Sequence, residues 1–124
     1  MLEYQIFESI GEEGFQRLVR GFYARIPADT VLGPMYPEGD FEAAEVRLRD
    51  FLVGRFGGPT RYVDARGHPR LRMRHMPFAI DGVARDHWLE HMNAALDEAE
   101  LPEDVTQFLR PFFTQVADFL VNRR

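Results

Sequence analysis

The chain has 124 residues, a formal net charge of −5, 45% hydrophobic residues and no cysteine. This length suits one domain, residues 1–124, and the lack of cysteine excludes disulfides, thiolate metal sites and cysteine nucleophiles. The acidic balance argues against a protein built mainly to bind nucleic acid; no signal peptide is visible and no apolar run is long enough to span a membrane, so we expect a cytoplasmic protein.

The first half of the chain shows the apolar spacing of helices. A first helix ends at Pro27, and its one-sided stripe consists of Phe15, Leu18, Val19, Phe22, Tyr23 and Ile26. Residues 29–40 are rich in turn-forming residues, so we expect a loop there. A second helix runs from about Glu42 to Phe56 and ends at Gly57-Gly58-Pro59. Its inner face would consist of Ala44, Leu48, Phe51, Leu52 and Phe56.

Beyond the second helix, Thr60 to His68 is expected to form a loop with at most one short turn. A short helix is predicted between Pro69 and Pro77, because proline suits a first helical position and ends a helix. Asp81 is a candidate N-cap for a long helix that reaches about Ala99. The apolar stripe of this helix consists of Ala84, Trp88, Met92, Ala95 and Ala99, widened by Leu89 and Leu96.

The last predicted helix opens at Pro102. Its broad apolar face consists of Val105, Phe108, Leu109, Phe112, Phe113, Val116 and Leu120. Pro111 lies inside this helix and should kink or restart it, because proline has no N–H to donate. Strand alternation, internal repeats and linkers are absent from the sequence. We therefore predict an all-α fold with four substantial helices and short connections.

The stretch from Arg66 to Phe78 concentrates four arginines and two histidines among apolar residues. If His75 points inward and the arginines point to a rim, this segment can hold an apolar cofactor that carries acidic groups. Haem is such a cofactor, since imidazole ligates its iron and guanidinium groups meet its propionates. Leu71 and Phe78 could contact the ring faces, and Arg70 and Arg74 lie on a neighbouring face. The alternative is a structural histidine beside solvated arginines that pair with acids.

Three further residues could belong to the same site. Tyr23, Tyr36 and Trp88 are either amphipathic core rings or donors that converge on one cavity. In the second case, two hydroxyls and an indole N–H would stabilise a bound diatomic ligand that carries partial negative charge.

Two other motifs are given less weight. The run from His87 to His91 matches the zinc-protease pattern H-x-x-E-H. We reject this reading because burial of Trp88 and Met92 turns both histidines toward the flank or the solvent, and no third ligand is evident. The arginine cluster could also bind phosphate or RNA, but the acidic balance and the lack of a nucleic-acid motif oppose this.

At these residues the chain resembles a group II truncated haemoglobin of the bacterial type. The similar segments follow the family order along nearly the whole chain: Phe22-Tyr23-Ala24, Met35-Tyr36-Pro37-Glu38, Ala44 to Arg49, Gly57-Gly58-Pro59, Arg66 to His75 with Pro77-Phe78, and Arg85 to Leu89. Three places depart from the family pattern: Gly11-Glu12 near the first turn, Arg55-Phe56 before the second glycine pair, and Pro111 in the last helix.

The resemblance implies a two-over-two helical sandwich around one haem b. It implies His75 as the iron ligand, with its other ring N–H on a backbone carbonyl, and Tyr23, Tyr36 and Trp88 as the hydrogen-bonding set on the opposite side. Ala44 takes the place where many globins have a distal histidine. The remaining implied contacts are Leu48 and Phe51 on the distal haem face, and Arg47 and Arg74 on the propionates, with Tyr62 and His68 nearby.

Together these readings predict a globin that binds O2, CO and NO and releases O2 slowly, because release must break the hydrogen bonds. A haem redox enzyme, either an NO dioxygenase or a peroxidase, is the alternative, since slow release suits transport poorly. A haem-free helical interaction module is the third reading. A reductase partner is expected, and exposed apolar surface on the last helix leaves both a monomer and a homodimer open.

Overall fold

The computed structural model describes residues 1–36 and 39–123, and within these residues every regular element is a helix. The elements are α1 (Gln5–Arg25), the 3-10 helix η1 (Gly33–Met35), α2 (Phe41–Arg55), α3 (Arg61–Arg66), α4 (Leu71–His75), α5 (Gly82–Glu98) and α6 (Glu103–Leu120). The turn predicted at Pro37 and Glu38 lies outside the described residues. None of the described helices is both long and apolar enough to cross a membrane.

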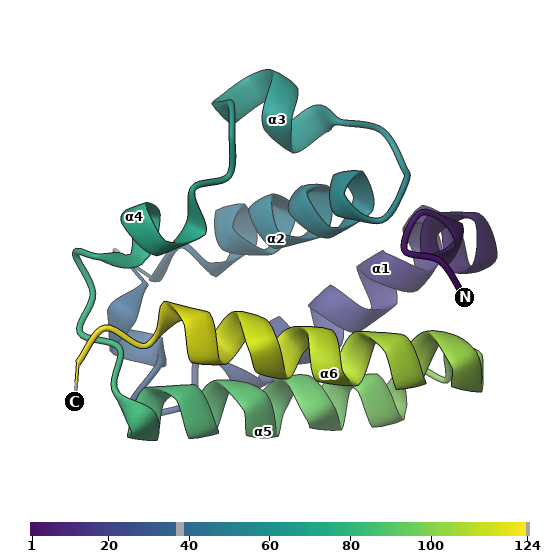
Figure 1. Ribbon diagram of the computed structural model, residues 1–124. Coiled ribbons are helices and arrows are strands. Elements are labelled where there is room, and N and C mark those ends of the chain that lie inside the picture. Colours follow the sequence, from purple (N-terminus) through teal and green to yellow (C-terminus); the bar gives the residue numbers. More distant parts are fainter. Residues whose placement is uncertain (37–38, 124) are drawn as a thin grey trace.

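Four long helices form the frame of the fold. α1 packs against both α2 and α5, and α6 packs against α5. The short helices join this frame from outside, with α3 on α2 and α4 on α6. In Figure 1, α5 and α6 run side by side in opposite directions, with α2, α3 and α4 on one side of this pair. The prediction of an all-α fold with four substantial helices is confirmed.

α1 consists of two helical segments that meet at Gly11. The backbone of this glycine has φ 64° and ψ −174°, which an L side chain rarely adopts. The sequence prediction found only the second segment, because residues 5–10 give fewer than two turns of periodicity. This first segment nevertheless buries Ile6 completely in the core.

The end of α2 depends on Gly57, whose φ is 103°. A Cβ atom at this position would collide with the backbone of Tyr4. We therefore expect Gly57→Ala to lower the free energy of unfolding by at least about 2 kcal/mol, from backbone strain and the clash together. Gly82→Ala is the matched control, because a Cβ there meets no atom within 4 Å. Urea unfolding of the two variants tests this, and equal stabilities would contradict it.

The loop predicted over Thr60–His68 is wrong in part, because Arg61–Arg66 form the helix α3. Tyr62 is the only buried residue of this helix. Its ring lies edge-on to Phe51, with the ring centres 5.7 Å apart. The packing of this one aromatic residue therefore stabilises α3. Periodicity could not predict the helix, because it has too few apolar residues.

The prediction that the last helix restarts at Pro111 is also wrong, because α6 runs unbroken from Glu103 to Leu120. Pro111 and Gln107, one turn earlier, are both exposed. The carbonyl that loses its N–H partner at Pro111 can therefore bind water instead.

The core lies between the long helices and is rich in phenylalanine. Its largest fully buried rings are Phe15, Phe22, Phe56 and Phe113. Leu48, Phe51 and Trp88 pack against this core but are only partly buried. These three side chains border a cavity, and this explains why the predicted inner faces of α2 and α5 are incompletely covered.

Candidate functional site

A cavity of about 470 Å³ opens between α2, α4, α5 and α6. All of the predicted site residues except His68 and Arg70 line it: Tyr23, Tyr36, Ala44, Arg47, Leu48, Phe51, Tyr62, Leu71, Arg74, His75, Phe78 and Trp88. His68 is exposed on the loop between α3 and α4, outside this lining. The structure therefore brings together residues that are up to 65 positions apart in the sequence.

Other lining residues were not predicted as site residues: Leu32, Met35, Arg66, Ile80, Ala84, Arg85, Val116, Ala117 and Leu120. Val116 and Leu120 lie on the predicted apolar face of α6, where their periodicity predicts core packing and does not distinguish it from a cavity wall. Leu32, Met35 and Ile80 lie in or beside loops, where apolar spacing gives no signal.

The His75 ring is held in one orientation on the short helix α4. Its Nδ1 lies 2.7 Å from the carbonyl oxygen of Leu71, which confirms the predicted backbone hydrogen bond. A carbonyl can only accept, so Nδ1 carries the hydrogen and Nε2 keeps a free lone pair. Such a ring can donate that lone pair to a metal.

Asn122, which follows α6 in the chain, fixes the end of α4. Its side-chain amide donates to the carbonyl oxygens of His75, at 3.3 Å, and Phe78, at 3.0 Å. Its side-chain oxygen accepts from the Ile80 N–H at 2.9 Å, and its own N–H donates to the Ile80 carbonyl at 2.8 Å. A five-residue helix is too short to hold its position alone. No sequence pattern predicts this role, because Asn122 lies 47 residues from His75.

Tyr23, Tyr36 and Trp88, the three predicted hydrogen-bond donors, all line the cavity. The Tyr36 hydroxyl donates to the Tyr23 hydroxyl at 3.4 Å. Burial raises the pKa of both tyrosines, so both hydroxyls keep their protons. The Trp88 ring packs between Phe22, with ring centres 5.3 Å apart, and Phe113, with ring centres 5.8 Å apart. The donors are therefore held by aromatic packing as well as by hydrogen bonds.

Arginines form one edge of the cavity. Arg74 donates from Nε to the Pro69 carbonyl and from Nη2 to the Arg66 carbonyl, each at 2.9 Å. The guanidinium groups of Arg66 and Arg74 each lie 5.9 Å from the centre of the Tyr62 ring. These partners, two backbone carbonyls and an aromatic ring, carry no negative charge, so they do not neutralise the positive charges of Arg66 and Arg74. This edge can therefore bind carboxylates.

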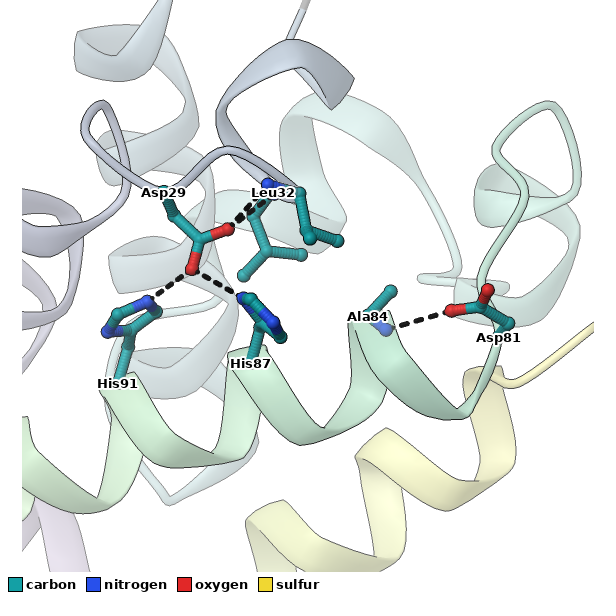
Figure 2. A network of polar contacts seen from close by, with 7 residues as sticks. Asp29, Leu32, Asp81, Ala84, His87 and His91 are labelled. Carbon is teal, nitrogen blue, oxygen red and sulfur yellow. Dashed lines mark hydrogen bonds and ion pairs between the residues drawn. The ribbon is translucent and has the colours of Figure 1, made fainter.

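His87 and His91 point toward the flank of α5, as predicted, but they meet a partner there that the sequence did not indicate (Figure 2). One oxygen of Asp29, Oδ2, accepts from His87 Nδ1 at 2.8 Å and from His91 Nε2 at 2.6 Å. The other oxygen, Oδ1, accepts from the N–H groups of Val31 and Leu32, each at 2.8 Å. The Asp29 side chain is only 5% exposed. We call Asp29, His87 and His91 the Asp29 network.

The Asp29 network gives the fold a pH-dependent stability. The hydrogen bond from His87 to Asp29 raises the pKa of His87 above its ordinary 6.5. Burial raises the pKa of Asp29, but the hydrogen bonds from Leu32, His91 and His87 outweigh this and hold that pKa below its ordinary 3.8. The stabilisation by charged His87 is therefore complete below pH 6.5 and is lost as the pH rises through its raised pKa. The stabilisation by charged Asp29 is lost only as the pH falls through the lowered pKa of this residue.

We expect Asp29→Asn to lower the free energy of unfolding more at about pH 6 than at about pH 9. Asparagine keeps an oxygen for the Val31 and Leu32 N–H groups but removes the charge that favours protonated His87. Urea unfolding of wild type and variant at the two pH values measures this difference. An equal loss at both pH values would show that the charge of Asp29 contributes nothing.

Comparisons with known proteins identify the family. A family model described as bacterial-like globin matches residues 5–122. The group 2 truncated hemoglobin YjbI of Bacillus subtilis is 37% identical over 117 residues, which cover 94% of this chain and 88% of that protein.

Solved structures agree with this match. The hemoglobin of the thermophilic phototrophic bacterium Chloroflexus aurantiacus has a TM-score of 0.92 and 48% identity, over 95% of this chain and 98% of that one. A truncated oxygen-avid haemoglobin from Bacillus subtilis has a TM-score of 0.89 and 36% identity, over 94% and 98% of the two chains. Sequence and fold thus match along nearly the whole length, and the chain belongs to the bacterial-like globin family as a group II truncated haemoglobin.

Proposed function

We propose that this protein binds one haem b through His75 and that it binds O2, CO and NO reversibly, with slow release of O2. The observation that carries the proposal is the cavity, whose lining includes both His75 and the donors Tyr23, Tyr36 and Trp88. Membership of a haemoglobin family supports haem, and the Bacillus subtilis relative that is described as oxygen-avid supports tight O2 binding.

The residues present fit a haem group. The cavity volume of about 470 Å³ lies within the usual range for cofactor sites, and its lining is mostly apolar, as a porphyrin requires. When bound, haem supplies an iron that takes one protein ligand and leaves a position for a small ligand. His75 offers the free Nε2 lone pair, and Leu71 and Phe78 lie beside it along the cavity wall.

The arginine edge would hold the acidic groups of the cofactor. We assign Arg47 and Arg74 to the two propionates, because both line the cavity and guanidinium groups bind carboxylates strongly. The Tyr62 ring lies next to the guanidinium groups of Arg66 and Arg74, and its hydroxyl could donate to the acidic groups of the cofactor. A contact of exposed His68 with a propionate stays a prediction.

The donors that line the cavity would control how long a ligand stays. Ala44 is buried at the cavity and has no polar group, so hydrogen bonds must come from Tyr23, Tyr36 and Trp88. Leu48 and Phe51 also line the cavity and would exclude water from the bound ligand. In a dry site each hydrogen bond to a partly charged ligand is worth about 1–3 kcal/mol. Release must break these bonds and is therefore slow.

The same expectation favours a second function. A protein that releases O2 slowly delivers it poorly, so we keep a redox role, either NO dioxygenase or peroxidase, beside O2 binding and transport. Turnover with NO or with peroxide and a reductant, measured on the purified protein, distinguishes the redox role from simple binding.

Reversible O2 binding needs ferrous iron, so we further propose that an acidic reductase is a partner of this protein. We also propose the cytoplasm as the compartment in which the protein meets this reductase. Ion pairs with carboxylates occupy Arg17, Arg25, Arg49, Arg55, Arg61, Arg85 and Arg110. Over residues 1–36 and 39–123, no such pair involves Arg66 or Arg70, and both are exposed beside the cavity. Their unpaired charge would attract an acidic protein to the cavity edge.

The double variant Arg66→Glu, Arg70→Glu is expected to slow one-electron reduction of the ferric protein by a reduced acidic ferredoxin about tenfold at low salt. Arg20→Glu on α1, an exposed site away from the cavity, is the matched control. Stopped-flow reduction at several salt concentrations measures both variants. A reduction rate that is the same at all salt concentrations and the same in the wild type and the double variant would exclude docking at this edge.

We keep two alternatives for the oligomeric state, a monomer and a homodimer. Phe119 of α6 is 57% exposed and would lie in the interface of a homodimer. Sedimentation of wild type and Phe119→Ser distinguishes the two states.

The pyridine haemochrome spectrum of the purified protein tests the proposed cofactor. We expect the spectrum of haem b at one haem per chain. Purified protein that takes up no haem after reconstitution would leave only the haem-free helical module.

A further inference from the structure

We propose that Asp29, His87 and His91 are positioning residues that hold Tyr36 and Trp88 in place at the cavity, and that the charge on His87 sets the rate of ligand release. The proposal rests on the proposed haem function. Asp29, His87 and His91 are not among the residues that line the cavity, so they would act on a ligand only through the two donors.

On the loop side, Asp29 fixes the chain that leads to Tyr36. Its Oδ1 accepts from the Val31 and Leu32 N–H groups, and its backbone carbonyl accepts from the Gly33 N–H at 2.9 Å. Gly33 begins the 3-10 helix η1, and its carbonyl accepts from the Tyr36 N–H at 3.2 Å. One carboxylate thus determines where the turn that carries Tyr36 begins.

On the helix side, the two histidines lie on either side of Trp88. His87 precedes Trp88 directly, and His91 follows one turn later on α5. Figure 2 shows both rings reaching from α5 to the same carboxylate. The position of the Trp88 turn relative to the 29–36 loop therefore depends on these two hydrogen bonds.

Protonation changes the strength of this link without changing its partners. The ring nitrogens that face Asp29 donate in the neutral and in the charged form of each histidine. A charged ring makes a stronger bond, because both donor and acceptor are then ionised. Since Asp29 raises the pKa of His87, the link is tightest below that pKa and weakens as the pH rises.

Other charges around the network have their own places. On α5 itself, Asp86 and Glu90 also raise the pKa of His87, by smaller amounts than the Asp29 hydrogen bond. The neighbouring helices contribute cations farther along α5, where each pairs with an acid: Arg25 of α1 with Glu98, and Arg110 of α6 with Asp97. Asp29 is therefore the acid that bonds both histidines.

The test measures O2 dissociation from the ferrous, haem-loaded protein between about pH 5.5 and about pH 8.5, the range in which histidine titrates. We expect the rate constant to rise about two- to fivefold with pH, with a midpoint above 6.5. Asp29→Asn should release O2 at the fast rate throughout. Asp81→Asn is the matched control, because Asp81 caps the start of α5 through the Ala84 N–H at 2.9 Å and should keep the wild-type profile.

A vibrational readout separates positioning from mere stabilisation. Resonance Raman of the CO complex reports the donors near the ligand, and its iron–carbon frequency should shift with pH in wild type but not in Asp29→Asn. If Asp29→Asn does not fold, His87→Gln replaces it, with the same expectation. A profile shared by wild type and both variants, in protein with a normal haem spectrum, would overturn the proposal alone. Protein without a haem spectrum would overturn the proposed function and this proposal together.

Discussion

Replacing Trp88 with phenylalanine is expected to raise the O2 dissociation rate constant about 5- to 150-fold. The change removes the indole N–H, a hydrogen-bond donor at the cavity, and keeps an aromatic ring between Phe22 and Phe113. A hydrogen bond to a partly charged ligand in a dry site is worth about 1–3 kcal/mol, and release must break it. Stopped-flow displacement of O2 by CO measures the rate constant.

The CO dissociation rate of the same variant is the internal control. CO carries little charge and gains little from a donor, so its release should change far less than that of O2. Tyr23→Phe and Tyr36→Phe then divide the remaining stabilisation between the two hydroxyls, which are joined at 3.4 Å and should not act additively. An unchanged O2 rate in Trp88→Phe would remove Trp88 from the proposed role.

Replacing His75 with glycine is expected to abolish retention of haem through purification, because the cavity then offers no nitrogen ligand for the iron. Over the described residues, no other histidine lines the cavity: His68 is exposed, and His87 and His91 face Asp29. Added imidazole should enter the vacated space and restore a haem spectrum. Titration of the variant with haem, with and without imidazole, measures both effects.

Circular dichroism controls for the fold of this variant. Only the His75 side chain is lost, so α4 should keep the Asn122 hydrogen bonds to the backbone of residues 75 and 78. Wild-type affinity for haem in His75→Gly would show that another residue binds the iron.

Much of the fold could be predicted because the long helices have one-sided apolar faces. The periodicity of residues 15–26 and 105–120 predicts the second segment of α1 and the helix α6, and Asp81 caps α5 through the Ala84 N–H as predicted. Chemistry and spacing alone point to His75, Leu71, Phe78, Arg70 and Arg74 and offer Tyr23, Tyr36 and Trp88 as donors, whereas resemblance to a family supplies the other expected site residues. All of them except His68 and Arg70 line one cavity.

The rest depends on contacts between distant parts of the chain, which periodicity cannot show. Asp29 looked like one more turn residue until the fold placed it against His87 and His91, about 60 positions later. Asn122 shows no sequence pattern of its own, yet it holds the end of the helix that carries His75. Tyr62 forms α3 by packing on Phe51. In each case tertiary contacts decide the outcome, and local sequence preference does not.

The most direct test of the account is the absorption spectrum of the purified protein, recorded ferric, then reduced, then with CO. We predict a Soret band in each form, a clear shift when CO is added to the reduced protein, and loss of this spectrum in His75→Ala. No Soret band after haem reconstitution, or an unaltered spectrum in His75→Ala, would contradict the central claim that His75 holds a haem in this cavity.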